Sequence, residues 1–186
     1  MSLESTRRRL TAKQADTIQR LSNAALAVLS REGFGGLTIR LVAAEAGIGA
    51  ATAYTYFSSK EHLVAEVFWR RLASSPAPAS QQSSTERVIG VLRHIALLVA
   101  DEPEFAGAVT NALMGRDPDV EHLRDRIARE IRGRLVDAVG ADADAALIEA
   151  LELLYTGALV HAGMGYVSYS EIADRLDRSA RMLLSA

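Results

Sequence analysis

The chain of 186 residues contains no cysteine, only four prolines and few aromatic residues, which make up 5% of it. Without cysteine there is no disulfide framework, no thiolate metal site and no thiol nucleophile. The longest strongly apolar stretch, near Ile95–Ala100, is far short of the roughly 20 residues that a membrane span needs. Met1–Arg9 carries basic residues with no apolar segment behind them, which argues against a secretory signal. We therefore expect a cytoplasmic protein with no membrane partner.

Charge is unevenly spread, although the net formal charge is only −2. Residues 1–71 carry ten basic and six acidic side chains, a balance of +4, whereas residues 72–186 carry eleven and seventeen, a balance of −6. A basic first part beside an acidic remainder favours an anionic partner for the first part alone. Excesses of this size also arise by compositional drift, so charge alone leaves both interpretations open.

Helix-forming residues dominate, and no convincing run of alternating β-branched residues occurs. Helix starts are indicated by N-cap residues, several of them in capping boxes, at Thr11, Ser58, Ser83, Asp117, Asp142 or Asp144, and Ser168. The pattern predicts an all-α fold of about nine helices. We expect a helix-turn-helix head at residues 1–57, a connecting helix at 58–73, a loop at 74–84 that is rich in Ser, Ala and Pro, and a helical domain at 85–186.

Residues 37–60 carry the most informative pattern. Thr38 is a good N-cap for a short helix, Gly47 can adopt the left-handed conformation of a tight turn, and a second short helix is predicted at Ala50–Tyr56. Two short helices joined by a glycine-containing turn have the helix-turn-helix geometry. By itself this spacing is a weak signal, because Tyr54 and Tyr56 could be ordinary packing residues.

Several side chains of this segment suit contact with duplex DNA. Ala50, Ala51 and Thr52, at the start of the second helix, would lie deepest in a major groove, where alanine and the threonine methyl can contact thymine methyl groups. Other side chains suit phosphate or base contacts, and they are Thr38, Arg40, Tyr54, Thr55, Tyr56 and Lys60.

Further motifs extend over residues 18–67, namely Ala24-Ala25, Glu32-Gly33-Phe34, Leu37-Thr38-Ile39-Arg40, Ala46-Gly47-Ile48, Tyr54-x-Tyr56-Phe57 and Ser59-Lys60-Glu61-x-Leu63. Together they resemble the amino-terminal DNA-binding domain of the TetR family of bacterial transcriptional regulators. The resemblance implies a three-helix DNA-binding head, a fourth connecting helix, and a helical carboxy-terminal domain that binds a small effector and dimerises. By matching position it also implies that Tyr54 and Lys60 hold phosphates.

The chain departs from the family pattern at two places. Gly49 stands where the family usually has serine, and Ala51-Thr52-Ala53-Tyr54 stands where Gly-Thr-Leu-Tyr is usual. The glycine removes a hydroxyl that could cap the helix or contact a phosphate, and Ala53 makes a core position smaller. These differences affect the expected operator sequence more than the expected fold.

The remaining two-thirds of the chain matches the family by architecture only. The last two long helices, about 142–164 and 170–185, are expected to form a homodimer interface or, alternatively, to pack within one chain, and the candidate residues are Ala145, Leu151, Leu154, Leu159, Met182 and Leu183. An effector pocket would lie among the middle helices. Its candidate lining residues, each of which could instead be plain core, are His94, Phe105, Met114, Tyr155, His161 and Met164.

No catalytic or cofactor motif is evident. The four histidines lack metal-ligand spacing, and we find no phosphate-binding loop and no nucleophile–base pair. The sequence therefore predicts no enzyme, no cofactor and no metal. It favours a homodimeric regulator that binds double-stranded operator DNA, acts as a repressor and is released by a small apolar or amphipathic effector. The alternative is a helical small-molecule-binding protein or enzyme that retains the head as a fold element only.

Overall fold

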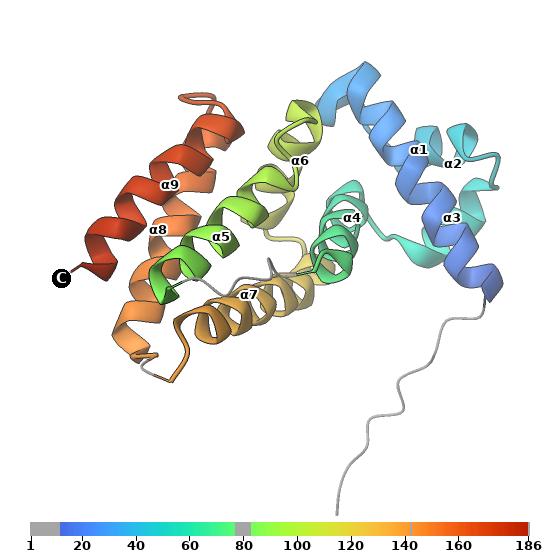
Figure 1. Cartoon of the computed structure of the whole chain (residues 1–186). Coiled ribbons are helices and arrows are strands. Elements are labelled where there is room, and N and C mark those ends of the chain that lie inside the picture. The colour runs from blue at the N-terminus through green and yellow to red at the C-terminus, as the bar shows by residue number, and fades with distance from the viewer. Residues whose placement is uncertain (1–11, 77–82, 142, 186) are drawn as a thin grey trace, which may run out of the picture.

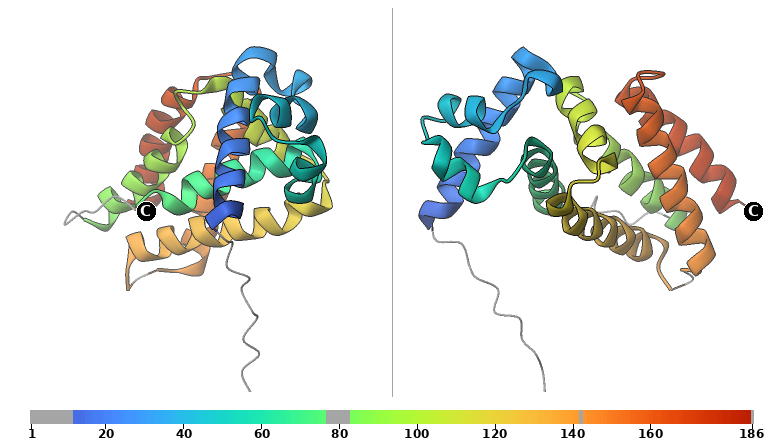
Figure 2. Two further views of the ribbon diagram at one scale, coloured as in Figure 1. Left: turned by 90° about the vertical axis from the view of Figure 1, so that its right-hand side faces the viewer. Right: turned by 180° about the vertical axis from the view of Figure 1, so that it is seen from behind.

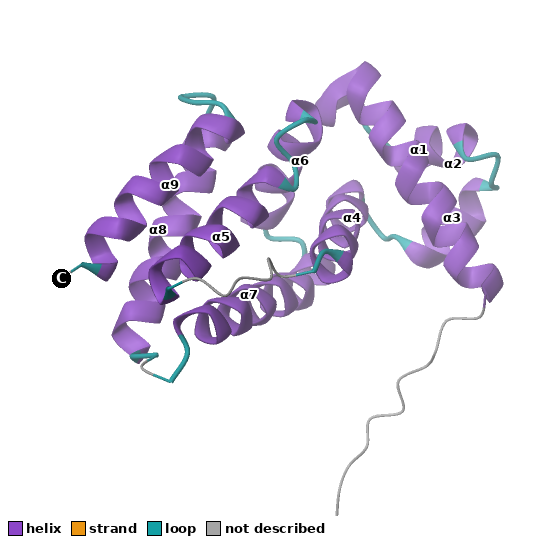
Figure 3. Cartoon of the chain, in the orientation of Figure 1, coloured by secondary structure: helices purple, strands orange, loops and turns teal. Residues whose placement is uncertain are grey.

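A computed structural model describes residues 12–76, 83–141 and 143–185, and every regular element within these ranges is a helix (Figure 3). The described helices are α1 (Ala12–Gly36), α2 (Ile39–Glu45), α3 (Ala50–Tyr56), α4 (Lys60–Ser74), α5 (Ser84–Leu97), α6 (Pro103–Met114), α7 (Pro118–Val139), α8 (Ala145–Gly163) and α9 (Tyr169–Leu184). The predicted all-α fold is confirmed. The predicted caps Thr11 and Asp142 and most of the predicted loop at 74–84 lie outside the described residues.

The helices form a small head, which consists of α1–α3, and a larger body, which consists of α4–α9 (Figure 1). Helices α1–α3 lie at one end of the molecule, α8 and α9 lie side by side at the other, and α4–α7 lie between them, as the further views in Figure 2 also show. Both α4 and α6 pack against α1, and α4 also packs against α6 and α7. Helices α4 and α6 of the body therefore pack directly against α1 of the head.

Serine, threonine and aspartate caps start several helices where the sequence predicts them. Their side chains accept a hydrogen bond from a first-turn backbone N–H, and these caps are Thr38, Ser83, Asp117 and Ser168. The start of α4 differs from the prediction by one residue. The hydroxyl of Ser59, and not that of Ser58, accepts the hydrogen bond from the His62 backbone N–H, at 2.9 Å.

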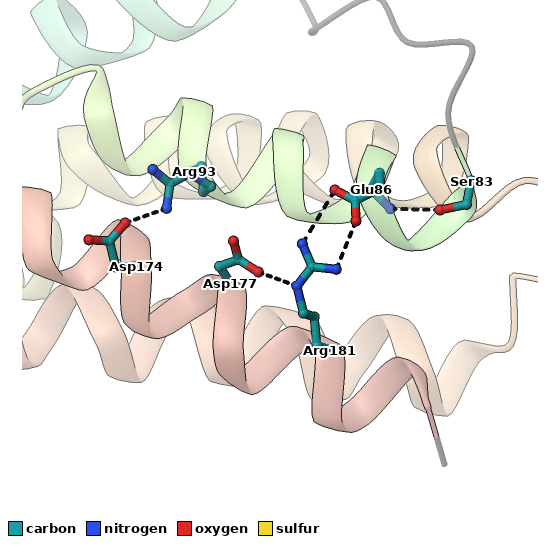
Figure 4. Close-up of polar contacts among 6 residues, drawn as sticks. All are labelled: Ser83, Glu86, Arg93, Asp174, Asp177 and Arg181. Carbon is teal, nitrogen blue, oxygen red and sulfur yellow. Dashed lines mark hydrogen bonds and ion pairs between the residues drawn. The ribbon is translucent and has the colours of Figure 1, made fainter.

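Helix α9 packs against α5, and ion pairs lie along the exposed edge of this pair (Figure 4). Arg93 contacts Asp174 at 2.6 Å, and Arg181 contacts Glu86 at 2.7 Å and Asp177 at 2.6 Å. Exposed pairs of this kind contribute about 0.2–1 kcal/mol each. Most of the stabilisation must therefore come from the buried side chains beneath them, which include Leu92, Ile95, Ile172 and Leu176.

Helix α8 is apolar around most of its circumference. By length and composition alone Ala145–Gly163 could cross a membrane, and 22% of its apolar stretch is buried within the chain. Glu149 and Glu152 interrupt this stretch, so it does not form an uninterrupted apolar run in the sequence. A single helix of this kind is weak evidence for a membrane span, since a helix that packs against another chain has the same composition.

Candidate DNA-binding head and ligand cavity

The turn between α2 and α3 is held from two sides. Gly47 has a φ of 63°, in the left-handed region that favours glycine. The Ile48 backbone N–H donates to the Ala43 carbonyl at 2.8 Å, and the Arg20 guanidinium of α1 donates to the Ala46 carbonyl at 2.6 Å. The predicted glycine turn is confirmed, and a side chain of α1 fixes its position.

Helix α3 buries one face and exposes the other. Ala53 is fully buried and Phe57, which directly follows the helix, is 2% exposed. Gly49, Ala50, Ala51 and Thr52 at its start are exposed. A helix that presents small side chains in its first turn and is anchored from behind has the shape needed to enter a major groove.

The nine predicted DNA contacts all lie in the head or at the start of α4. The exposed ones are Thr38, Arg40, Ala50, Ala51, Thr52, Tyr54 and Thr55, whereas Tyr56 and Lys60 are half-buried. Thr38 accepts a hydrogen bond from the Leu41 backbone N–H, and the Thr55 hydroxyl donates to the Ala51 carbonyl at 3.1 Å. Both hydroxyls therefore already have partners within their helices. Among the described residues, Arg40 has no ion pair or hydrogen bond from its guanidinium.

Lys60 has a structural contact that the sequence did not reveal. Its ammonium donates to the Phe34 carbonyl at 2.8 Å and lies 4.4 Å from the centre of the Phe34 ring. Lys60 thus ties the start of α4 to the end of α1. An ammonium has three N–H donors, so this contact is compatible with the predicted phosphate contact, which remains a prediction.

The start of α7 contacts the segment that joins α3 to α4. The Ser58 hydroxyl donates to the Asp119 carboxylate, and its oxygen lies 3.2 Å from His62 Nδ1. A hydrogen bond from the Ser59 side chain holds the pKa of Asp117 below its ordinary value, against the opposing effect of burial. The His62 ring packs edge-on against Phe57, with ring centres 5.5 Å apart. We call the five polar residues Ser58, Ser59, His62, Asp117 and Asp119 the polar junction.

A cavity of about 430 Å³ lies in the body among α4, α6, α7 and α8. Its lining residues are Phe68, Val109, Thr110, Leu113, Met114, Arg124, Ile127, Ala128, Ile131, Glu152, Tyr155, Thr156, Leu159 and Val160. Of the six side chains predicted to line a pocket, Met114 and Tyr155 are in this lining. Burial raises the pKa of Tyr155, so its hydroxyl stays protonated and can act as a donor.

The other four predicted pocket residues lie elsewhere, which corrects the prediction for this cavity. Phe105 is 2% exposed and packs in the core, with the Arg71 guanidinium 4.8 Å from its ring centre. His161 is exposed and contacts the Tyr166 ring edge-on. Met164 is 59% exposed at the end of α8, and His94 is on α5, which packs against α7 and α9.

Stability should depend on pH through His94. Burial, and secondly the nearby positive charge of Arg134, lower the pKa of His94 below its ordinary value. The unfolded chain therefore binds this proton more readily, so the stability contributed by the neutral ring is present above about pH 6.5 and is lost as the pH falls below it. We expect His94→Gln to flatten the fall in thermal midpoint between about pH 7 and pH 5. His122→Gln, at an exposed position on α7, is the control, and equal slopes for wild type and His94→Gln would contradict the assignment.

Comparisons with known proteins agree with this division into head and body. Residues 21–67 match the family model described as bacterial regulatory proteins, tetR family, and residues 82–183 match the tetracyclin repressor-like C-terminal domain. An HTH-type transcriptional regulator of Mycobacterium tuberculosis is 46% identical over 176 residues, which are 93% of this chain and 83% of that protein. The HTH-type transcriptional repressor KstR of Rhodococcus jostii is 25% identical over 178 residues, 92% of this chain and 84% of that protein. The crystal structure of a TetR transcriptional regulator from Rhodococcus sp. RHA1 superposes with a TM-score of 0.77 at 21% identity, covering 94% of this chain and 98% of that one.

Proposed function

Because the chain belongs to the TetR family of HTH-type transcriptional regulators, we propose that it is a homodimeric repressor that a small apolar or amphipathic ligand releases from its operator. One observation supports the DNA-binding surface above all others. The exposed first turn of α3 consists of small side chains, and the buried Ala53 and Phe57 hold it from behind. The related repressor KstR supports repression as the mode of action.

Binding of the purified protein to DNA from upstream of its own gene tests this function directly. We expect a specific shift in gel mobility at low salt that an unrelated fragment of equal length does not show. A folded dimer that binds neither fragment would favour the alternative, a small-molecule-binding protein or enzyme in which the head is only a fold element.

Exposed apolar side chains on α8 and α9, at the end of the body farthest from the head (Figure 1), support the homodimer. Leu153 on α8 is 67% exposed and Met182 on α9 is 75% exposed. Of the predicted interface residues, Leu151 is fully buried within the chain and Leu159 lines the cavity, so the remaining Ala145, Leu154, Met182 and Leu183 are the better candidates. In this proposal α3 is the recognition helix, the helix that enters the major groove. A second copy of the chain would supply a second α3 for the other half-site of the operator, about 34–36 Å away. The mass of the protein in solution tests this directly.

Arg40 should contribute to the salt dependence of DNA binding. Its guanidinium is exposed on α2 and has no partner among the described residues, so it is available to a phosphate. We expect Arg40→Gln to reduce the slope of log affinity against log salt by about one for each subunit in contact. Arg129→Gln, exposed on α7 in the body, is the matched control. If the slope for Arg40→Gln equals that of the wild type, the prediction that Arg40 contacts a phosphate is wrong.

We place the coupling between ligand and DNA at the polar junction. The cavity is bounded by α6 and α7, and the Ser58–Asp119 and Ser59–Asp117 contacts link the start of α7 to the residues between α3 and α4. A small displacement of α7 would therefore reach the segment that directly follows the recognition helix. The spacing of the two recognition helices in the dimer would then leave the value that fits the operator.

Asp119→Asn should weaken this coupling without changing ligand binding. The residue is outside the cavity lining, and asparagine keeps an acceptor oxygen for the Ser58 hydroxyl but removes the charge that strengthens this hydrogen bond. We expect the ligand-induced loss of DNA affinity to shrink by about 2- to 30-fold, the range that residues between coupled sites produce. Glu121→Gln, exposed in the same first turn of α7, removes a carboxylate without touching the junction. Unchanged coupling in Asp119→Asn would rule out this route.

A further inference from the structure

The walls of the cavity are mostly hydrocarbon. Val109 and Leu113 come from α6, Ile127 and Ile131 from α7, and Leu159 and Val160 from α8. Burial of apolar surface against such walls supplies most of the affinity for a small ligand, whereas the few polar groups set its orientation. The polar and charged side chains in the lining therefore decide which class of ligand fits.

Two charged side chains line the cavity, and only one of them has its charge compensated. The Glu152 carboxylate pairs with the Arg132 guanidinium at 2.7 Å. The Arg124 guanidinium has no carboxylate within ion-pair distance among the described residues; its Nη1 donates to the carbonyls of Leu113 at 2.9 Å and Gly115 at 2.5 Å. The lining thus carries one uncompensated positive charge.

This positive charge lies at one end of the part of α7 that lines the cavity, which extends from Arg124 to Ile131. Arg124 and the partner of Glu152, Arg132, are eight residues apart on α7, which corresponds to about 12 Å along a helix. The lining residues of α7 between them, Ile127, Ala128 and Ile131, are apolar. The arrangement suits a ligand with an apolar body and one anionic head group.

The remaining donors favour a carboxylate as that head group. A guanidinium presents parallel N–H groups that match the two oxygens of a carboxylate, and Nε and Nη2 of Arg124 are not used in its backbone contacts. The Tyr155 hydroxyl is a further donor in the same lining and has no hydrogen-bond partner among the described residues. A phosphate monoester would bring a second negative charge that no side chain of the lining compensates.

We propose that the cavity binds an apolar monocarboxylate whose carboxylate pairs with Arg124 and whose hydrocarbon body lies along α7 toward Ile131. The inference rests on the proposed function, because it names the ligand class of the effector cavity. Arg124 also holds the carbonyls at the end of α6, so a ligand that draws its guanidinium away acts on the loop that leads to Asp117 and the polar junction.

Calorimetric titration of the full-length protein with four ten-carbon probes tests the assignment. Decanoate, decanol, decylamine and decyl phosphate share one chain and differ only in the head group. We expect decanoate to bind at least about tenfold more tightly than decanol, because a charge-assisted hydrogen bond forms only with the acid. Equal affinity for acid and alcohol, preference for the amine or the phosphate, or no binding of any probe would overturn the proposal.

Variants of Arg124 locate the head group. Arg124→Gln should bring the affinities for decanoate and decanol within about twofold of each other, while Arg124→Lys, which keeps the charge, should retain a preference for the acid. Arg129→Gln, on the same helix but outside the lining, is the control and should behave as the wild type. Retention of the full preference in Arg124→Gln, with its circular dichroism unchanged, would also overturn the proposal. If Arg124→Gln does not fold, the titrations of Arg124→Lys and of the wild type still show whether the protein prefers decanoate to decanol.

DNA binding by the ligand-free protein separates this inference from the proposed function. If the protein binds upstream DNA specifically but does not prefer decanoate to decanol, the proposed function as a regulator is supported and the proposed ligand class is wrong. A preference for the acid that depends on Arg124, in a protein that binds no DNA, supports the ligand class and contradicts the regulator.

Discussion

Replacing Arg134 by methionine should lower the free energy of unfolding by about 3 kcal/mol. Arg134 on α7 is 9% exposed, and its guanidinium donates to the carbonyls of Leu72 at 2.7 Å and Ser75 at 3.0 Å. Leu72 is in the last turn of α4 and Ser75 is its C-cap, and the Leu72 carbonyl also accepts hydrogen bonds from the Ser75 backbone N–H at 3.2 Å and from the Ser75 hydroxyl at 2.9 Å. Methionine fills a similar volume but donates nothing, so the carbonyls would lose hydrogen bonds that contribute about 1.5–3 kcal/mol each when the donor is charged.

Urea unfolding at one fixed protein concentration measures this change, because the stability of a dimer depends on concentration. Arg132→Met is the matched control, since Arg132 is on the same helix and pairs with Glu152 at the surface. We expect the control to lose no more than about 1 kcal/mol. Equal losses in the two variants would mean that water replaces the guanidinium of Arg134 at the end of α4.

Arg134 illustrates what the sequence could not reveal about α7. The apolar stripe of Leu123, Ile127, Ile131 and Leu135 predicts which face of the helix is buried, and all four residues are buried. Arg134 lies in a run of charged residues that favours a solvated surface. Its burial depends on the end of α4 lying against α7, and no pattern within α7 encodes that neighbour.

The DNA-binding head was predicted more accurately than the body because its signals are local. The Thr38 cap, the Gly47 turn and the buried Ala53 each depend on residues close in the sequence, and the structure confirms all three. The Lys60 contact with Phe34 spans 26 residues and was missed for that reason. Whether the exposed residues contact DNA remains a prediction.

The cavity shows the opposite behaviour. Residue type suggested Phe105 and His94 as lining residues, but Phe105 is buried in the core and His94 is on α5, which contributes no residue to the lining. Arg124 was missed although a signal existed, since it follows Leu123 and precedes Ile127 by three residues, next to the apolar stripe. Its importance becomes clear only from the structure, where Glu152 pairs with Arg132 and Arg124 has no carboxylate partner among the described residues.

The largest functional effect should come from Ala51→Glu, which we expect to reduce operator affinity by at least about 100-fold. Ala51 is exposed in the first turn of α3, so the substitution has no core side chain to displace and should leave folding intact. A glutamate there would bring a negative charge and a longer side chain toward the phosphates that line the groove. Such juxtaposition of like charges costs several kcal/mol, and a dimer bears that cost at both half-sites.

Fluorescence anisotropy with labelled upstream DNA, at one fixed salt concentration, measures the loss. Ala73→Glu, exposed on α4, adds the same charge and the same side chain away from the predicted surface, and we expect it to change affinity by no more than about threefold, because screening weakens charges far from the DNA. An operator affinity of Ala51→Glu equal to that of the wild type would contradict the prediction that α3 lies in the groove. Equal losses in both variants would mean that net charge, and not the position of α3, governs binding. Only a loss confined to Ala51→Glu fits a recognition helix whose first turn lies against the base edges, since a nonspecific electrostatic attachment would respond to both substitutions alike.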